Sequence, residues 1–274
     1  MRRFLVRLSL FILLFAFVVF CYHWLYFNHR PVKPDVNKTI LIIGDSHTEC
    51  AVDDSVFNRG LNLSYSGTGY IQSYLKLKEV CEYQKIDTVI LSFWQRSLCD
   101  SADDFDLQNG HLFFPYWSGN EAKIYLSHYR FYKELIESPM SVSNAIYDLG
   151  SFYRNDRDIK TFLKKKQDSG KDPDGENHYG NKYSIMYLKK IAALCQAKGI
   201  KLILLSTPMW NYRNKEIDRN SEFYTDYEKY FGEIEFRDYS CMKLPEEYYA
   251  DDNHLNYKGA KLFSEYLLKE LRPE

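Results

Sequence analysis

Apolar and polar positions follow two patterns along most of this chain. Short, fully apolar runs are typical of strands that are buried on both faces of a sheet. Segments with an apolar residue every three or four positions are typical of amphipathic helices. We expect strands at residues 39–43, 61–65, 88–93, 201–206 and 234–239. We expect helices at residues 48–57, 71–83, 184–198, 223–231 and 257–271. Because strands that alternate with helices pair in parallel, the pattern predicts an α/β fold. Its expected form is a three-layer α/β/α sandwich around a parallel sheet of about five strands.

Residues from about 100 to 181 interrupt this alternation and follow no single period. We interpret them as an insertion in the α/β domain. Some helix is expected within it, at residues 122–137 and 142–162, followed by a polar loop at residues 167–180.

The chain begins with Arg2, Arg3 and Arg7, followed by an uncharged apolar run over residues 8–27. A helix of about 20 residues spans the ~30 Å hydrocarbon layer of a bilayer. No small-residue cleavage site follows the run, so we expect an uncleaved membrane anchor at residues 1–28. A linker (29–37) and the α/β domain (38–274) follow. The slight excess of positive charge before the span favours a domain outside the cytoplasm, with a tethered cytoplasmic domain as the alternative.

Composition excludes some classes of function. The chain has 36 Lys and Arg against 37 Asp and Glu, for a formal net charge of −1. A nucleic-acid-binding protein would need a strongly basic face, so we expect no nucleic-acid partner. The six Cys form no Cys-x-x-Cys pair, and the His residues show no metal-ligand spacing. We therefore expect neither a metal nor another cofactor.

Two short segments carry most of the candidate chemistry. Gly44-Asp45-Ser46-His47 follows the first expected strand, and Asp251-Asp252-Asn253-His254 precedes the last expected helix. In a parallel sheet these positions meet at one edge, where ligands bind. A Ser, a His and an Asp are the minimum set for nucleophilic acyl chemistry. The alternative is that these residues only cap helices and turns. His47 adjoins Ser46 and should point elsewhere, so we do not expect it to be the base.

These two segments resemble the first and last conserved blocks of the GDSL/SGNH hydrolase superfamily. The resemblance covers residues 38–100 and 184–272, most of the soluble chain. It implies that Ser46 is the nucleophile and that His254 is the general base and then the general acid. It also implies that Asp251 orients His254, with Asp252 as the rival for this role.

The same resemblance implies an oxyanion hole formed by the N–H groups of Ser46 and Gly67, with Gly69 as the alternative to Gly67. The family's third block, Gly-x-Asn-Asp, is missing, since the chain reads Ser92-Phe93-Trp94-Gln95-Arg96 there. Gln95 is the candidate replacement for its Asn side chain, and Arg96 and Trp94 are candidates for substrate binding. Losing one oxyanion donor typically costs ~10²–10³ in rate.

Two functions from different classes follow. The resemblance to anchored enzymes that add or remove O-acetyl groups implies a membrane-anchored serine O-acyl esterase or O-acetyltransferase. It would act on an acylated cell-envelope glycan through an acyl-serine intermediate, and hydrolysis and transfer both stay open because they share one triad. The alternative is a non-catalytic SGNH-fold subunit that binds or assembles envelope polysaccharide, which the missing third block and the aromatic insertion favour. A lipid-directed esterase, suggested by the short tether, is a third interpretation.

Overall fold

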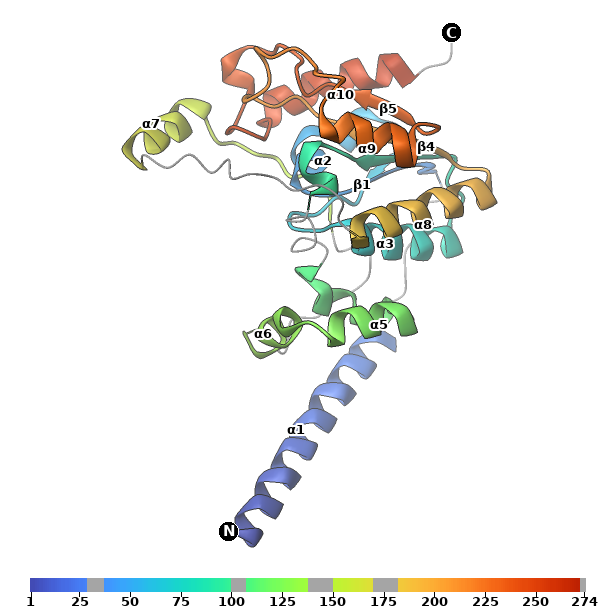
Figure 1. Ribbon diagram of the computed structural model, residues 1–274, viewed down its shortest axis with the longest axis vertical. Coiled ribbons are helices and arrows are strands. Elements are labelled where there is room, and N and C mark those ends of the chain that lie inside the picture. Colours follow the sequence, from blue (N-terminus) through green and yellow to red (C-terminus); the bar gives the residue numbers. More distant parts are fainter. Residues whose placement is uncertain (29–36, 100–106, 138–149, 170–181, 272–274) are drawn as a thin grey trace.

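One parallel sheet organises the soluble part of the protein. The computed structural model describes residues 1–28, 37–99, 107–137, 150–169 and 182–271 (Figure 1). The strands are β1 (Ile40–Ile43), β2 (Gly60–Asn62), β3 (Thr88–Ser92), β4 (Lys201–Ser206) and β5 (Glu235–Asp238). They lie in the order β2-β1-β3-β4-β5, and every neighbouring pair is parallel. The predicted α/β fold with a five-stranded parallel sheet is therefore confirmed.

Helices cover both faces of this sheet. They are α2 (Ser46–Ala51), α3 (Tyr70–Tyr83), α8 (Lys182–Lys198), α9 (Glu222–Phe231) and α10 (Tyr257–Leu271). Figure 1 shows α3 and α8 side by side on one face and α10 on the other, and close contacts join α3 to α8 and α10 to α2. Short parallel strands need such crossover helices, which explains the layered architecture.

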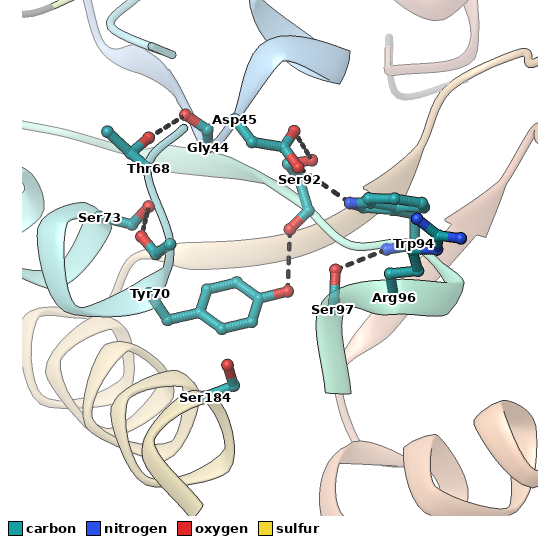
Figure 2. Close-up of a pocket in the computed structure, with 11 residues that line it drawn as sticks. Gly44, Asp45, Thr68, Tyr70, Ser73, Ser92, Trp94, Arg96, Ser97 and Ser184 are labelled. Atoms are coloured by element: carbon teal, nitrogen blue, oxygen red, sulfur yellow. Dashed lines mark hydrogen bonds between the residues drawn. The ribbon is translucent and has the colours of Figure 1, made fainter. Parts of the chain in front are cut away.

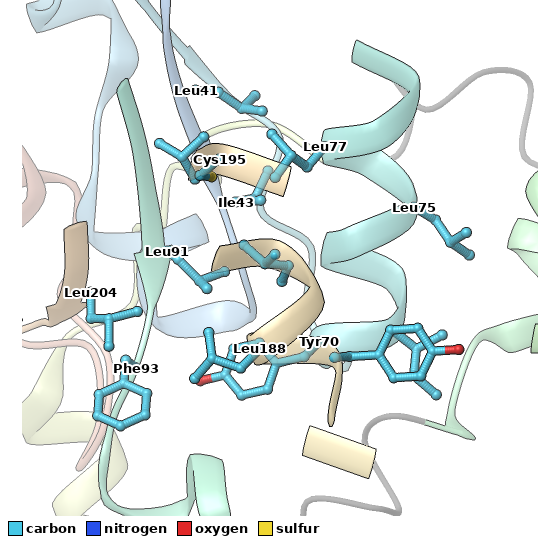
Figure 3. Packing of buried hydrophobic residues seen from close by; sticks show 14 of the residues in the cluster. Leu41, Ile43, Tyr70, Leu75, Leu77, Leu91, Phe93, Leu188, Cys195 and Leu204 are labelled. Carbon is cyan, nitrogen blue, oxygen red and sulfur yellow. The ribbon is translucent and has the colours of Figure 1, made fainter. Parts of the chain in front are cut away.

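The apolar strands supply side chains to two separate cores. Leu41 and Ile43 of β1 belong to the cluster that contains the buried residues of α3 and α8 (Figure 3). Ile42, between them, packs instead with Phe263 and Leu267 of α10. Successive side chains of a strand point to opposite faces, so an uninterrupted apolar run fills both layers at once. This alternation explains why β1 contains no polar position.

The first predicted helix has the wrong bounds. Helix α2 begins at Ser46 rather than at residue 48, because the Asp45 side chain accepts a hydrogen bond from the His47 N–H and caps the helix there. It ends at Ala51, and Asp53 caps a separate 3-10 helix, η1 (Asp54–Val56). The last predicted helix, residues 257–271, matches α10.

The insertion also differs from its predicted outline. The helix expected at 122–137 is two helices, α5 (Gly119–Leu126) and α6 (Tyr129–Glu137). Residues 150–158 are not helical, and α7 spans Ile159–Ser169, so the helix predicted at 142–162 is wrong at residues 150–158 and confirmed only at residues 159–162. Residues 142–149 of that prediction, and residues 170–180 of the predicted polar loop, lie outside the described residues.

Helix α1 (Arg2–Asn28) carries the predicted membrane anchor. Its segment Arg2–Tyr22 has 21 residues with a mean hydropathy of 2.7. Among the described helices, it is the one with the length and composition to cross a membrane. A single span is consistent with this finding.

Lys76 of α3 is a fully buried lysine beneath the segment that follows β2. Its Nζ donates a 2.6 Å hydrogen bond to the carbonyl of Leu63, and the rings of Tyr65 and Phe113 lie nearby. Burial lowers the pKa of Lys76 to about 7, and the charge of Glu49 opposes this shift only in part. Near neutral pH, this side chain therefore loses its proton far more readily in the folded than in the unfolded protein.

The first prediction concerns Lys76→Met in the full chain in mild detergent. Between the folded pKa and the ordinary lysine pKa, the unfolded state binds more protons than the folded state, so stability rises with pH. We expect the unfolding free energy of wild type minus that of Lys76→Met to increase by about 1.4 kcal/mol per pH unit from about pH 7.5 to 9. Urea unfolding at several pH values measures it. A difference that stays constant with pH would contradict the prediction.

Candidate active site

Ser46 lies just after the carboxyl end of β1. The first residue after this strand, Gly44, occupies a position where only glycine fits. The pairing of Ile43 with Leu91 brings Gly44 alongside Ser92 at the end of β3. Gly44 has a φ of 145°, and a Cβ added to it would lie 2.3 Å from the Cβ of Ser92. The chain can therefore turn from strand to helix at this point only with glycine.

Ser46 is the first residue of α2, and two distant segments meet at its side chain. The Nε2 atom of His254 lies 2.8 Å from the Ser46 Oγ, across 208 positions of sequence. The Nδ1 atom of His254 lies 2.7 Å from the Oδ1 atom of Asp251. With its Nδ1 proton donated to the carboxylate, the ring presents the Nε2 lone pair to the serine hydroxyl. The three groups are thus arranged as a nucleophile, a base and an orienting carboxylate.

The turn before α10 fixes the imidazole ring of His254. The Asp251 Oδ1 atom also accepts hydrogen bonds from the N–H groups of Asn253 and His254, both at 3.0 Å. The Ala250 N–H donates to the His254 carbonyl, which closes the turn. Asp251, rather than its rival Asp252, is therefore the carboxylate in contact with the His254 ring.

The carboxylate of Asp251 is held in its charged form. Burial by itself would raise its pKa, but the hydrogen bond and charge of His254, the Asn253 N–H and the charge of Arg157 together outweigh burial. The net effect keeps the pKa of Asp251 below its ordinary value. An ionised carboxylate at this position is what the Nδ1–H donor requires.

Arg157 is a site residue that the sequence analysis missed. Its Nη2 atom donates a 2.7 Å hydrogen bond to the Oδ2 atom of Asp251, opposite the oxygen that holds His254. Asn155 orients it by accepting from both its backbone N–H and its Nε. Both residues belong to the non-helical segment before α7, and Arg157 lies 94 positions before Asp251. No motif marks this segment, so nothing in the sequence connected it to the triad.

Two backbone N–H groups are available for an oxyanion. Neither the Ser46 N–H, at the start of α2, nor the Gly67 N–H has an acceptor among the described residues. Gly67 has a φ of 71°, a conformation that glycine adopts without strain. The alternative, Gly69, donates its N–H to the Oε1 atom of Gln72 at 2.9 Å. Of the two glycines, Gly67 is thus the one whose amide is free.

The end of β3 and the loop after it hold the cap of α2. The Ser92 Oγ and the Trp94 Nε1 donate to the two carboxylate oxygens of Asp45, at 2.8 and 2.9 Å (Figure 2). The Trp94 N–H thus supports the cap of α2. The predicted contact of Trp94 with substrate stays a prediction. Gln95 accepts a 2.5 Å hydrogen bond from the Tyr212 hydroxyl through its Oε1 atom. Within the described part of the chain, no hydrogen bond links Gln95 to Ser46.

Asp45 and His47 form a second carboxylate–imidazole pair beside the triad. The Nδ1 atom of His47 lies 3.1 Å from the Oδ2 atom of Asp45, and its ring lies against Trp94 with 4.1 Å between centroids. Burial by itself would raise the pKa of Asp45, but His47 and the Ser92 hydroxyl outweigh it and hold the pKa far below its ordinary value. His254, and not His47, contacts the Ser46 hydroxyl, as expected.

A small cavity of about 40 Å³ lies beside these groups. Gly44 and Asp45 line one side of it, Thr68 another, and Arg96 a third (Figure 2). Gly69 also belongs to its lining. It is thus bounded by the neighbours of both candidate oxyanion donors. Its size leaves room for only a few water-sized groups.

Comparison with known proteins gives distant structural similarities. A search of curated protein sequences finds no match. A family model without a description matches residues 154–273, less than half of the chain. A Streptococcus pneumonia structure, provisionally described as a platelet activating factor, aligns with a TM-score of 0.42 and 16% identity over 98% of this chain and 99% of its own. A GDSL-like lipase from Bacteroides thetaiotaomicron gives 0.39 and 14%, over 92% and 95%. An acetyl xylan esterase gives 0.39 and 11%, over 85% and 100%.

The second prediction tests the role of Trp94. Trp94→Phe keeps the aromatic contact with His47 but removes the N–H that Asp45 accepts. A hydrogen bond to a charged group contributes about 1.5–3 kcal/mol, so we expect the unfolding free energy to fall by this amount. Denaturant unfolding of the full chain in detergent measures it. Unchanged stability would show that the Asp45 carboxylate does not depend on this donor.

Proposed function

We propose that this protein is a divergent GDSL/SGNH-type serine esterase or acyltransferase. One observation carries the proposal: the continuous hydrogen-bonded chain from the Ser46 Oγ through His254 to Asp251. It joins the two segments whose residues resemble the family's first and last blocks. A helix cap and a structural histidine would not need all three groups in this order.

The geometry suggests a mechanism in two halves. In the first, the Nε2 atom of His254 takes the Ser46 hydroxyl proton as the Oγ attacks the acyl carbonyl carbon. Asp251 stabilises the imidazolium that forms, and the N–H groups of Ser46 and Gly67 receive the negative oxygen. The tetrahedral intermediate collapses to an acyl-Ser46 ester when the imidazolium protonates the departing alcohol.

In the second half, another hydroxyl attacks the acyl-Ser46 ester. His254 again takes the proton of the incoming group and returns it to the Ser46 oxygen. Water as the incoming group gives hydrolysis, and a sugar hydroxyl gives transfer.

We further propose that α1 anchors the enzyme and that the domain lies outside the cytoplasm, where acylated envelope glycans occur. The apolar segment Arg2–Tyr22 supports the anchor, and the small excess of positive charge before it supports the orientation. The substrate would then be an acylated carbohydrate close to the membrane surface. Arg96, which lines the cavity, is the candidate to contact its polar groups.

One observation favours the alternative, a non-catalytic polysaccharide-binding or assembly subunit. Ser92, the last residue of β3, and Trp94 of the loop after it bind Asp45, and in the described structure this loop supplies no side-chain amide to Ser46. A subunit of this kind would bind acylated glycan without turnover, and binding would not depend on Ser46.

The third prediction separates these two functions. We expect the full chain in detergent to gain one phosphonyl group from a fluorophosphonate and to hydrolyse p-nitrophenyl acetate. Ser46→Ala should abolish labelling, and His254→Ala should slow it by about 10³-fold or more, because each removes part of one proton-transfer unit. Intact-mass spectrometry measures labelling, and Ser55→Ala is the matched control, since Ser55 is exposed and its hydroxyl donates to Asp53. Wild type that takes up no label would refute the enzyme and leave the binding subunit.

The fourth prediction identifies the orienting carboxylate. Asp251→Asn replaces an acceptor with an amide that can donate to the Nδ1 atom, which favours the wrong tautomer of His254. We expect kcat to fall by about 10³–10⁴-fold. Asp252→Asn is the control and should stay within about tenfold of wild type, because Asp251 holds the ring. The reverse order of the two variants would assign the role to Asp252.

A further inference from the structure

A residue of the insertion with a left-handed backbone conformation, Asn109, contacts the loop that contains Gly67, the second candidate oxyanion donor. Asn109 has a φ of 58°, and it is the only non-glycine residue with positive φ within the described ranges. Its Nδ2 atom donates to the carbonyl of Gly67 at 3.2 Å and, more weakly, to that of Ser66 at 3.5 Å. A residue in a sparsely populated backbone region persists only where its surroundings require it, and such residues cluster at functional sites.

These two carbonyls control the direction of the Gly67 N–H. The Ser66 carbonyl and the Gly67 N–H belong to the same planar trans peptide, so they point to opposite sides of it. Fixing the carbonyl therefore fixes the amide. The Gly67 carbonyl belongs to the next peptide plane, so Asn109 holds both planes that meet at the Gly67 Cα. Glycine without such restraint can rotate these planes at little cost.

Asn109 can act as a clamp because its own turn is held firmly. The Oε1 atom of Glu134 accepts the Asn109 N–H at 3.3 Å, and the other carboxylate oxygen lies 3.0 Å from the Nδ1 atom of His111. The buried side chain of Gln72 donates its Nε2 to the Gln108 carbonyl at 2.8 Å. The next residue, Gly110, packs so closely on Tyr125 that a Cβ there would lie 2.2 Å from the ring.

The glycine and the turn also fit each other sterically. A Cβ added to Gly67 would lie 3.1 Å from the Asn109 Nδ2 and 3.2 Å from the side chain of Gln108. The turn thus covers the face of Gly67 on which any other residue would carry its side chain. The Gly67 carbonyl accepts from Asn109, whereas the Gly67 N–H has no acceptor among the described residues. This N–H is therefore the polar group of Gly67 that can bind a ligand.

We propose that Asn109 is a positioning residue for the oxyanion hole: it clamps the peptide planes of Gly67 so that the Gly67 N–H faces the Ser46 site. This inference rests on the proposed function. It assigns the insertion a part in the reaction. The support comes from the side-chain amide of Asn109, whereas in the described structure the Gln95 amide makes no hydrogen bond to Ser46. Asn109 acts through Gly67 and does not touch the reacting atoms.

Two substitutions separate the side-chain amide from the backbone strain. Asn109→Gly adopts a φ of 58° without penalty, so it removes the amide without adding backbone strain. Asn109→Asp keeps the shape and the tolerance of this conformation, but its carboxylate cannot donate to the two carbonyls. Both variants should leave the Gly67 peptide free to rotate.

The experiment uses the full chain in detergent and compares both variants with wild type. The readouts are kcat and KM for p-nitrophenyl acetate, the rate of fluorophosphonate labelling and the melting temperature. We expect kcat to fall about 10–100-fold in both variants with KM changed by less than about threefold, because a misplaced donor weakens only the transition state. Asn220→Gly, at an exposed Asn, is the control and should behave as wild type.

The outcomes distinguish this inference from the proposed function. If wild type and Asn109→Gly react equally fast, the clamp is refuted while the esterase stands. If Asn109→Gly keeps its kcat but loses stability, Asn109 is only structural and the clamp is again refuted. If wild type itself neither hydrolyses the ester nor takes up label, the proposed function fails and the clamp fails with it. A lower kcat in a fully folded Asn109→Gly supports the clamp.

Discussion

The hydrogen bond between the Ser46 hydroxyl and the His254 ring is the interaction on which the rest of the site depends. It joins segments 208 positions apart, so it exists only if the whole sheet is assembled. The helices that follow the two residues are docked on each other: Ser264 of α10 accepts from the Asp53 N–H at 2.8 Å and donates to the Ala51 carbonyl at 3.4 Å. This contact between α10 and the end of α2 sets the distance between the two catalytic candidates before any substrate binds.

A second constraint on the position of Ser46 is the carboxylate of Asp45, which caps α2. This carboxylate receives the N–H that starts α2, a ring nitrogen of His47, and donors from Ser92 and Trp94. The end of β3 and the loop after it therefore stabilise the start of α2, the helix that begins with Ser46. This arrangement fixes the Ser46 amide, one of the two candidate oxyanion donors, whereas the Gly67 peptide is held by Asn109.

Much of the fold could be predicted from the sequence because its signals are local. Runs such as residues 39–43 and 201–206 are apolar throughout, and this marks buried parallel strands without reference to anything distant. The triad could be predicted because Gly44, Ser46 and His254 stand at fixed offsets from those strands and from the last helix.

The rest of the fold and of the site depends on contacts that no local pattern encodes. The break between α5 and α6 carries neither Gly nor Pro, since the chain there reads Leu126-Ser127-His128. Arg157 and Asn109 reach the site only because the insertion folds back onto the edge of the sheet.

The most direct test of this account is an experimental structure of the protein with a phosphonyl group on Ser46. We predict that the phosphoryl oxygen lies within hydrogen-bond distance of the N–H groups of both Ser46 and Gly67. We also predict that the His254 ring stays between the adduct and Asp251. An adduct whose oxygen points away from both amides, or a His254 ring that has no path to Ser46, would contradict it.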